Sequence, residues 1–286
     1  MKNFHLHTNM SDGTDSPLEL LAKVVESGCD AFSITDHDDL RANKIILEYL
    51  EANPSPVRFF TGVEMTSTFK GVDMHLLCHG FNIAHQSVAQ LIEESACLRK
   101  KRISTLIKEL PRVHGITIPK EDRCSILECE VPSSAQIAKS LRKLGVEGSI
   151  KELLKQYLSF LDDSDFAVDA TDVIKAFTLA GGLVTVAHPI EIQEDHNIGV
   201  EELKNILKEL KNIGLSGMEV FHNSHGPQEI ENYTNIAKEL NLLVSCGSDY
   251  HGRNKKNVEL MQFSNFGFVP DDEQITIYQA LSNKND

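Results

Sequence analysis

Features that define several large classes of proteins are missing from this sequence of 286 residues. No apolar run is long enough to cross a bilayer, so neither a membrane-spanning helix nor a membrane partner is expected. The first residues lead directly into a predicted strand, without the basic segment and apolar stretch of a secretory signal. Internal repeats and low-complexity segments are also missing. These absences favour a folded protein of the cytoplasm.

Positive charge and paired cysteines are both scarce. The chain holds 28 lysines and arginines against 42 aspartates and glutamates, which gives a formal charge of −14 at pH 7. This charge disfavours broad electrostatic attraction to nucleic acid or acidic membranes, but it allows a local basic patch for one phosphate. The six cysteines include no Cys-x-x-Cys pair. We expect reduced thiols, and a metal site on Cys124 and Cys129 is the weaker interpretation.

Predicted strands alternate with predicted helices in both the first and the last third of the chain. The strands are expected at residues 3–7, 30–35, 57–61, 74–80, 183–187, 217–221 and 242–246. Seven strands that alternate with helices imply a parallel sheet. Between residues 88 and 168 apolar positions recur at helical spacing without a strong strand signal. We therefore expect one domain formed by residues 1–87 and 169–286, and a helical insertion domain formed by residues 88–168.

Histidine and carboxylate side chains recur where these strands end. His5 and His7 lie two residues apart, so both point to the same side of the first strand, and Asp12 follows in a polar loop. Six of the seven predicted strands carry His, Asp or Glu at or just beyond the carboxyl end, and in the seventh His75 lies within the strand. Ligands from all round the sheet favour a closed βα-barrel over an open sheet, which gathers ligands at one switch point.

The order of these motifs is similar to that of the PHP (polymerase and histidinol phosphatase) family. The motifs are His5-x-His7, Ser11-Asp12-Gly13, Thr35-Asp36-His37, Gly62-Val63-Glu64, His75, Ala187-His188-Pro189 and Ser248-Asp249-Tyr250-His251. The similarity covers residues 3–85 and 171–265. Within the family the sequence most resembles stand-alone phosphoesterases that act on 3′,5′-bisphosphonucleotides and short RNA ends. The resemblance implies a distorted (β/α)7 barrel with a helical insertion at this place.

The resemblance also implies three clustered divalent metal ions. The implied ligand sets are His5, His7 and Asp249 with the bridging residue Glu64; Glu64, His75 and His188; and Asp12, His37 and His251. Six imidazoles, three carboxylates and no thiolate favour Mn²⁺, Fe²⁺ or Zn²⁺ over Mg²⁺ alone, with Mn²⁺ first. Clustered ions suit phosphoester hydrolysis, because they activate a bridging water and neutralise charge on the phosphoryl oxygens. Glu64 and Asp249 are expected to be catalytic in this way.

Substrate contacts are expected from one loop and one basic run. In the loop Asn223-Ser224-His225, relatives carry a Ser-His pair near the substrate. We expect Asn223 and His225 to contact the substrate, and His225 to donate a proton to the leaving oxygen. Arg99 and Arg102 belong to the only dense basic run, which would bind a phosphate or simply form a solvated helix face.

Other titratable residues have plainer interpretations. Asp36 is expected to support a ligand or to have a structural role, and His79 to pack in the core or behind the site. His114 and His196 are expected to be solvated. The role of His222 is left open.

One departure from the family concerns the insertion. Relatives that act on nucleotides usually open an insertion helix with Arg-Pro-His, whereas this chain reads Pro132-Ser133-Ser134-Ala135. The departure leaves the substrate open. We predict a metal-dependent phosphoric ester hydrolase that acts on a phosphomonoester of a small nucleotide or on an RNA end. The alternatives are a phosphatase or cyclic phosphodiesterase for a small sugar phosphate, and a non-catalytic module stabilised by its metals. The oligomeric state is left open.

Overall fold

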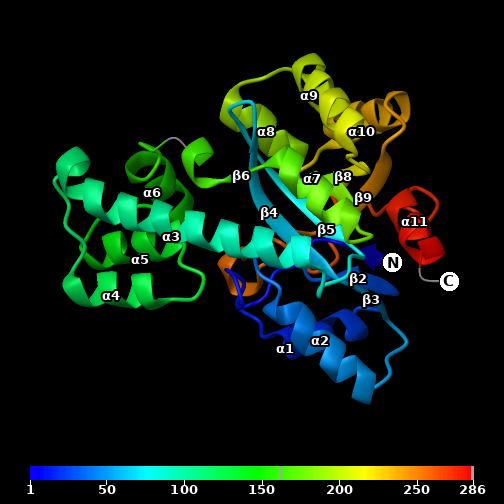
Figure 1. Ribbon diagram of the computed structural model, residues 1–286, viewed down its shortest axis with the longest axis horizontal. Coiled ribbons are helices and arrows are strands. Elements are labelled where there is room, and N and C mark those ends of the chain that lie inside the picture. Colours follow the sequence, from blue (N-terminus) through cyan, green and yellow to red (C-terminus); the bar gives the residue numbers. More distant parts are fainter. Residues whose placement is uncertain (162, 285–286) are drawn as a thin grey trace. The chain divides into compact units, whose positions relative to one another are not determined.

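The computed structural model describes residues 1–161 and 163–284 as an α/β protein (Figure 1). Backbone packing divides the chain into two compact units. One unit comprises Met1–Ile92 and Asp169–Asp286, and the other comprises Glu93–Val168. The first carries the sheets and the second is helical. That the helical unit acts as a separate insertion domain stays a prediction.

The described elements follow the predicted alternation at both ends of the chain. The strands are β1 (Lys2–Asn3), β2 (Ala31–Ser33), β3 (Arg58–Phe60), β4 (Gly62–Phe69), β5 (Val72–His79), β6 (Val168–Asp169), β7 (Leu183–Val186), β8 (Gly217–His222) and β9 (Leu243–Gly247). The first and last helices are α1 (Pro17–Glu26), α2 (Arg41–Ala52), α7 (Ala170–Leu179), α8 (Pro189–His196), α9 (Val200–Ile213), α10 (Pro227–Glu239) and α11 (Thr276–Lys284). Between them lie α3 (Gln86–His114), α4 (Lys120–Glu128), α5 (Ser134–Lys143) and α6 (Ile150–Tyr157).

The strands form two sheets. One is a parallel sheet in the order β1-β2-β3, and the other has the order β6-β4-β5-β7-β8-β9. Backbone hydrogen bonds also join the two sheets: the Phe4 amide donates to the Cys246 carbonyl at 3.0 Å, and the Glu64 amide donates to the Asp36 carbonyl at 3.4 Å. The α/β class is therefore confirmed, while the closure of one barrel stays a prediction because the strands form two separate ladders.

The predicted all-parallel sheet is wrong around β4 and β5. These strands pair antiparallel, and β5 also pairs antiparallel with β7. Lys70 and Gly71 connect β4 to β5, with φ angles of 52° and 80°. Positive φ at both central residues defines the tight hairpin turn that suits twisted strands. Glu64 consequently lies inside β4, whereas the sequence placed it just beyond the end of the third predicted strand.

A capping box fixes the start of helix α1. Ser16 and Glu19 form a reciprocal capping box, in which each side chain accepts a hydrogen bond from the other residue's backbone amide. Pro17 occupies the first turn, and Leu20 and Val24 are buried beneath the helix. The cap fixes the point at which the loop after β1 ends, and this loop carries Asp12.

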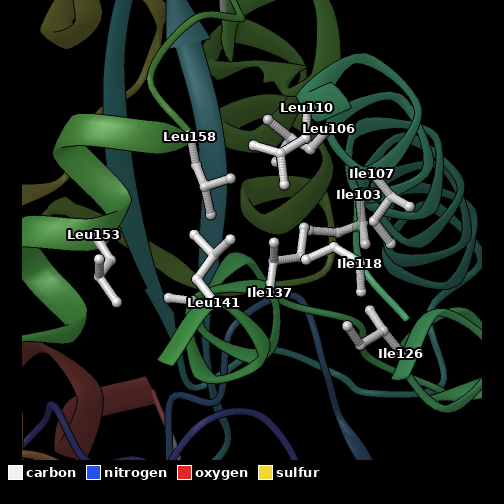
Figure 2. Close-up of a cluster of buried hydrophobic side chains, with 11 residues drawn as sticks. Ile103, Leu106, Ile107, Leu110, Ile118, Ile126, Ile137, Leu141, Leu153 and Leu158 are labelled. Atoms are coloured by element: carbon white, nitrogen blue, oxygen red, sulfur yellow. The ribbon is translucent and has the colours of Figure 1, made fainter. Parts of the chain in front are cut away.

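The helical unit has a core of its own. Figure 2 shows Leu and Ile side chains of α3 facing those of α4, α5 and α6. The buried cluster comprises Ile103, Leu106, Ile107, Leu110, Ile118, Ile126, Ile137, Ala138, Leu141, Leu153 and Leu158. Burial of these apolar surfaces is the main force that holds such a unit together. Among the described helices, none has the length and apolar character needed to cross a membrane.

Candidate metal centre

The nine predicted ligands come from strands and the loops that follow them. They are His5 and His7 after β1, Asp12 in the next loop, His37 after β2, Glu64 in β4, His75 in β5, His188 after β7, and Asp249 and His251 after β9. The structure brings these side chains together in the first unit, although they are spread over most of the sequence.

Glu64 lies at the middle of this group, with its side chain 1% exposed. One of its carboxylate oxygens, Oε2, is 3.1 Å from Nε2 of His5 and of His7. The other, Oε1, is 2.9 Å from Nδ1 of His75 and 3.0 Å from Nε2 of His188. The two oxygens thus face two different sets of imidazoles. A carboxylate that bridges two ions needs this arrangement.

Asp249 also lies close to His5 and His7. Its Oδ1 is 3.5 Å from Nε2 of His5 and 3.3 Å from Nε2 of His7. Its Oδ2 is 3.4 Å from Nε2 of His222 and is paired with the ammonium of Lys255. The backbone amide of Asp249 donates to the His5 carbonyl at 2.9 Å. This bond ties the end of β9 to the segment after β1, so both ligand-bearing segments are held together.

A third group forms around Asp12. Its Oδ1 is 3.1 Å from Nε2 of His251, and its Oδ2 is 3.9 Å from Nε2 of His37. With His7, these three residues form a group whose possible ligand atoms all lie within 4.8 Å of one another. The side chain of Asp12 is 36% exposed, whereas His7 is fully buried. The third group therefore lies at the open side of the cluster.

Several ring nitrogens in this cluster make no hydrogen bond within residues 1–161 and 163–284. They are both nitrogens of His7, and Nδ1 of His75 and of His188. A buried polar atom without a partner costs free energy unless a bound group supplies the contact. Imidazole and carboxylate donors without thiolates suit Mn²⁺, Fe²⁺ or Zn²⁺. The residues present therefore fit divalent metal ions.

The acid–base properties of the cluster reflect its dense packing. Burial disfavours the charged forms of Glu64 and Asp249, but the histidines around Glu64 and Lys255 beside Asp249 outweigh burial and hold both pKa values well below the usual range. Burial also opposes the charged form of His7. The nearby carboxylates of Asp249 and Glu64 nevertheless raise the pKa of His7 to about 9. For His37 burial dominates and lowers the pKa to about 3.

Comparison with known proteins agrees with this geometry. The family model described as the PHP domain matches residues 3–172, which is more than half of the chain. This chain belongs to the PHP family. The resemblance inferred from the ordered motifs is therefore confirmed.

Three characterised PHP-type relatives span most of the chain. A 5′-3′ exoribonuclease of Haemophilus influenzae is 25% identical over 87% of this chain and 89% of its own. A phosphoribosyl 1,2-cyclic phosphate 1,2-diphosphodiesterase of Eggerthella lenta is 24% identical over 88% and 95% of the two chains. A 3′,5′-nucleoside bisphosphate phosphatase of Chromobacterium violaceum is 21% identical over 87% and 86%. All three are named as hydrolases of phosphoric esters, which confirms the expected enzyme class.

Solved structures support the fold. A proposed metal-dependent phosphoesterase from Bifidobacterium adolescentis has a TM-score of 0.81 at 23% identity, with 99% of this chain and 96% of that chain covered. An amidohydrolase from Chromobacterium violaceum has a TM-score of 0.82 at 20% identity over the same shares of the two chains. The α/β fold of this chain is therefore shared along its whole length with these structures.

Of the predicted substrate residues, Asn223 and His225 lie beside the cluster of predicted ligands. The Asn223 amide donates to the Ser248 carbonyl at 2.6 Å, next to Asp249. His225 is fully buried, and its ring centroid is 5.3 Å from that of His222. Its Nδ1 is 2.8 Å from the Val220 carbonyl, and its Nε2 has no partner among the described residues.

Arg99 and Arg102 lie on α3 in the helical unit. The Arg102 guanidinium donates to the hydroxyl of Ser134 at 2.5 Å, where α5 begins.

The sequence left the role of His222 open and did not point to two other polar residues of the site, Glu219 and Lys255. His222 contacts Asp249 and is 1% exposed, and Lys255 pairs with Asp249. Glu219 is fully buried in β8 against His5. A carboxylate in the middle of an otherwise apolar strand was a usable signal for Glu219. No comparable signal distinguished Lys255 from the solvated lysine beside it.

The residues given plainer interpretations divide between confirmed and wrong. Asp36 supports the Asp12 loop, as predicted, because its carboxylate accepts from the Thr8 amide at 2.7 Å and the Ser11 hydroxyl at 2.6 Å. His114 and His196 are not simply solvated. The ring of His114 packs against that of Tyr157 at 5.1 Å, and Nε2 of His196 accepts from the Asp73 amide at 2.9 Å.

Proposed function

We propose that this chain hydrolyses a phosphomonoester of a small nucleotide, such as a 3′,5′-bisphosphonucleotide, or of an RNA end. The observation that carries the proposal is the position of Glu64, whose two oxygens face two sets of imidazoles. A carboxylate placed in this way would hold two cations close together. Paired cations stabilise both the attacking and the leaving oxygen of a phosphoester during hydrolysis.

Three divalent ions, with Mn²⁺ favoured, are proposed for this centre. Their ligands would be His5, His7, Asp249 and Glu64; Glu64, His75 and His188; and Asp12, His37 and His251. When bound, such ions lower the pKa of a shared water toward ~7 and neutralise charge on the phosphoryl oxygens. Glu64 and Asp249 would hold the ions in place, and the ammonium of Lys255 would offer a positive charge to the substrate phosphate.

His225 would accept a hydrogen bond from the substrate, and this revises the expected proton donation. The Val220 carbonyl can only accept, so Nδ1 of His225 carries a proton and the neutral ring has its lone pair on Nε2. Burial, followed by the nearby His222, lowers the pKa of His225 to about 3. A ring that stays neutral near pH 7 has no proton on Nε2 to give. Asn223, beside it, is proposed as a second substrate contact.

Arg99 and Arg102 are proposed to bind a second phosphate of the substrate. The support comes from Arg102, whose guanidinium reaches the start of α5 through Ser134. Arg102→Ala should then raise KM for a 3′,5′-bisphosphonucleotide more than for the matching monophosphate. Arg112→Ala is the matched control, since Arg112 is 77% exposed on the same helix and pairs with Glu109. Equal effects of the two substitutions would contradict this role.

The finer architecture is also proposed. The backbone hydrogen bonds from Phe4 to Cys246 and from Glu64 to Asp36 support closure of the two sheets into a distorted (β/α)7 barrel. We propose that residues 1–87 and 169–286 form this barrel domain and that residues 88–168 form the insertion.

A second candidate substrate is a small sugar phosphate or cyclic phosphate. The relative from Eggerthella lenta, which is named for a phosphoribosyl cyclic phosphate, favours it. No comparable observation favours a non-catalytic module, because all nine predicted ligands are present and lie together in the first unit.

A substrate panel tests the proposed function. Protein loaded with Mn²⁺ would be given a 3′,5′-bisphosphonucleotide, a short RNA with a 5′-phosphate, a circular RNA of the same sequence and a phosphoribosyl cyclic phosphate. Release of phosphate or nucleotide would be measured for each. We expect turnover of the first two and none of the circle. Turnover of the cyclic sugar phosphate alone would establish the second candidate, and turnover of none would contradict hydrolysis of these esters.

A further inference from the structure

Glu219 is a fully buried carboxylate that lies behind the proposed metal ligands. It belongs to β8, and its two oxygens are 3.1 Å and 3.3 Å from Nδ1 of His5. Oε2 also accepts a hydrogen bond from the backbone amide of His188 at 2.8 Å. A single carboxylate therefore contacts one proposed ligand through its ring and another through its backbone.

The contact with His5 determines which nitrogen of that ring carries a proton. A carboxylate accepts hydrogen bonds and donates none, so Nδ1 of His5 carries a proton. The lone pair of the neutral ring is then on Nε2. This atom is 3.1 Å from Oε2 of Glu64 and 3.5 Å from Oδ1 of Asp249, which places it at the centre of the proposed site. Glu219 thus selects the tautomer that a metal ion requires of His5.

The contact with His188 holds an unusual backbone. His188 has φ 23° and ψ 65°, a conformation that residues with a side chain rarely adopt. Its amide donates to Glu219 while its Nε2 lies 3.0 Å from Oε1 of Glu64. The hydrogen bond to Glu219 offsets part of the strain and keeps the ring directed at Glu64.

The close contact between Glu219 and His5 requires a glycine at position 247. A Cβ atom added at Gly247 would lie 2.1 Å from Cβ of His5 and 2.6 Å from Oε1 of Glu219. Only glycine in β9 allows the two side chains to approach each other here. Both oxygens of Glu219 face His5, and Oε2 also accepts from the His188 amide. Glu219 also forms a group with His5 and His222 whose possible ligand atoms lie within 4.8 Å of one another, so its own role as a ligand is one outcome of the test below.

We infer that Glu219 is a positioning residue of the metal centre, which fixes the His5 tautomer and the His188 backbone and so sets metal affinity. The inference rests on the proposed ligand roles of His5 and His188, and not on any substrate. Removal of such a partner typically weakens metal binding by roughly 10- to 100-fold.

The test measures metal binding without substrate. Affinity for Mn²⁺ and the number of bound ions would be determined by chelator competition for the unmodified protein, Glu219→Gln and Glu219→Asp. Asn43→Ala is the control, because it removes two buried hydrogen bonds to Gly62 and touches no proposed ligand. We expect a loss of roughly 10- to 100-fold in affinity for Glu219→Gln, a smaller loss for Glu219→Asp and no loss for Asn43→Ala.

Two results of the affinity measurement would overturn the inference. One is unchanged affinity in folded Glu219→Gln. The other is the loss of a single ion while the remaining ions bind with unchanged affinity, because that result would make Glu219 a ligand itself. In Zn²⁺-loaded protein with ¹⁵N-labelled histidine, His5 should show a protonated Nδ1, and an unprotonated Nδ1 would also contradict the inference. These readouts do not depend on hydrolysis, so an inactive protein leaves them interpretable.

Discussion

Oε1 of Glu64 lies 3.0 Å from Nε2 of His188, and 124 residues of sequence separate the two. Only the fold joins them, because Glu64 comes from the hairpin of β4 and β5 and His188 follows β7. The antiparallel pairing of β5 with β7 places these segments side by side. The second sheet therefore brings Glu64, His75 and His188 together, whereas His5 and His7 follow β1 of the other sheet.

The first prediction concerns Glu64. Glu64→Gln keeps the shape of the side chain but removes the charge that would hold two cations together. We expect at least one bound ion to be lost per chain and activity to fall by roughly 10³-fold or more. Elemental analysis of purified protein measures the first effect. His114→Ala is the control, since His114 packs against Tyr157 in the helical unit. Equal loss of metal in both variants would contradict the assigned site.

The second prediction concerns pH and the protein stripped of divalent ions. Burial opposes charge on His7 and His188, but neighbouring carboxylates raise both pKa values to about 9, above the unfolded value of 6.5. Their contribution to stability is therefore complete below pH 6.5 and is lost as the pH rises through 9. We expect the melting temperature of chelated protein to fall over this window.

Mn²⁺ should reverse this trend, because metal binding takes the place of the protons on the imidazoles. Calorimetry at pH 6, 7.5 and 9, with chelator or with Mn²⁺, makes the comparison. Glu64 has the opposite pH dependence because its pKa is lowered. Its contribution to stability is complete above about pH 4.5 and is lost only in stronger acid. A melting temperature of chelated protein that rises from pH 6.5 to 9 would show that the histidines are not paired in this way.

Features of the fold that follow from local sequence rules could be predicted, whereas contacts between distant segments could not. His5 and His7 could be assigned to one side of a strand because side-chain alternation is a local rule. The hairpin at Lys70 and Gly71 was missed because its turn lacks the usual Asn-Gly or Asp-Gly signature. Glu219 was missed because a strand pattern does not tell which distant side chain faces a buried charge. Contacts of this kind depend on strand order, which the sequence alone left open.

The third prediction concerns Lys255, whose ammonium pairs with Asp249 although its side chain is 40% exposed. A charge held at the open side of the cluster is placed to bind a substrate phosphate. Lys255→Met should raise KM for a phosphorylated substrate by about 10- to 100-fold, the equivalent of one lost hydrogen bond to a charged group. The number of bound ions should not change. Arg253→Met, two residues away and exposed, should have no effect on KM. Loss of metal in Lys255→Met would instead show that Lys255 holds Asp249 in position as a ligand.

The last prediction concerns His225 and separates two roles. A general acid would lose roughly 10²–10⁴-fold in kcat when replaced, and glutamine would not restore it because an amide does not transfer the proton. A hydrogen-bond acceptor would tolerate glutamine, whose amide oxygen also accepts. Because the Val220 carbonyl and burial keep Nε2 of His225 unprotonated, we expect His225→Gln to retain more than about a tenth of kcat. His225→Ala should lose more of its kcat/KM than His225→Gln, mainly because KM rises. The pH profile of kcat should keep its shape in both variants, since a neutral acceptor does not titrate near pH 7. If one limb of the pH profile of kcat disappears in His225→Gln, His225 is a proton donor after all.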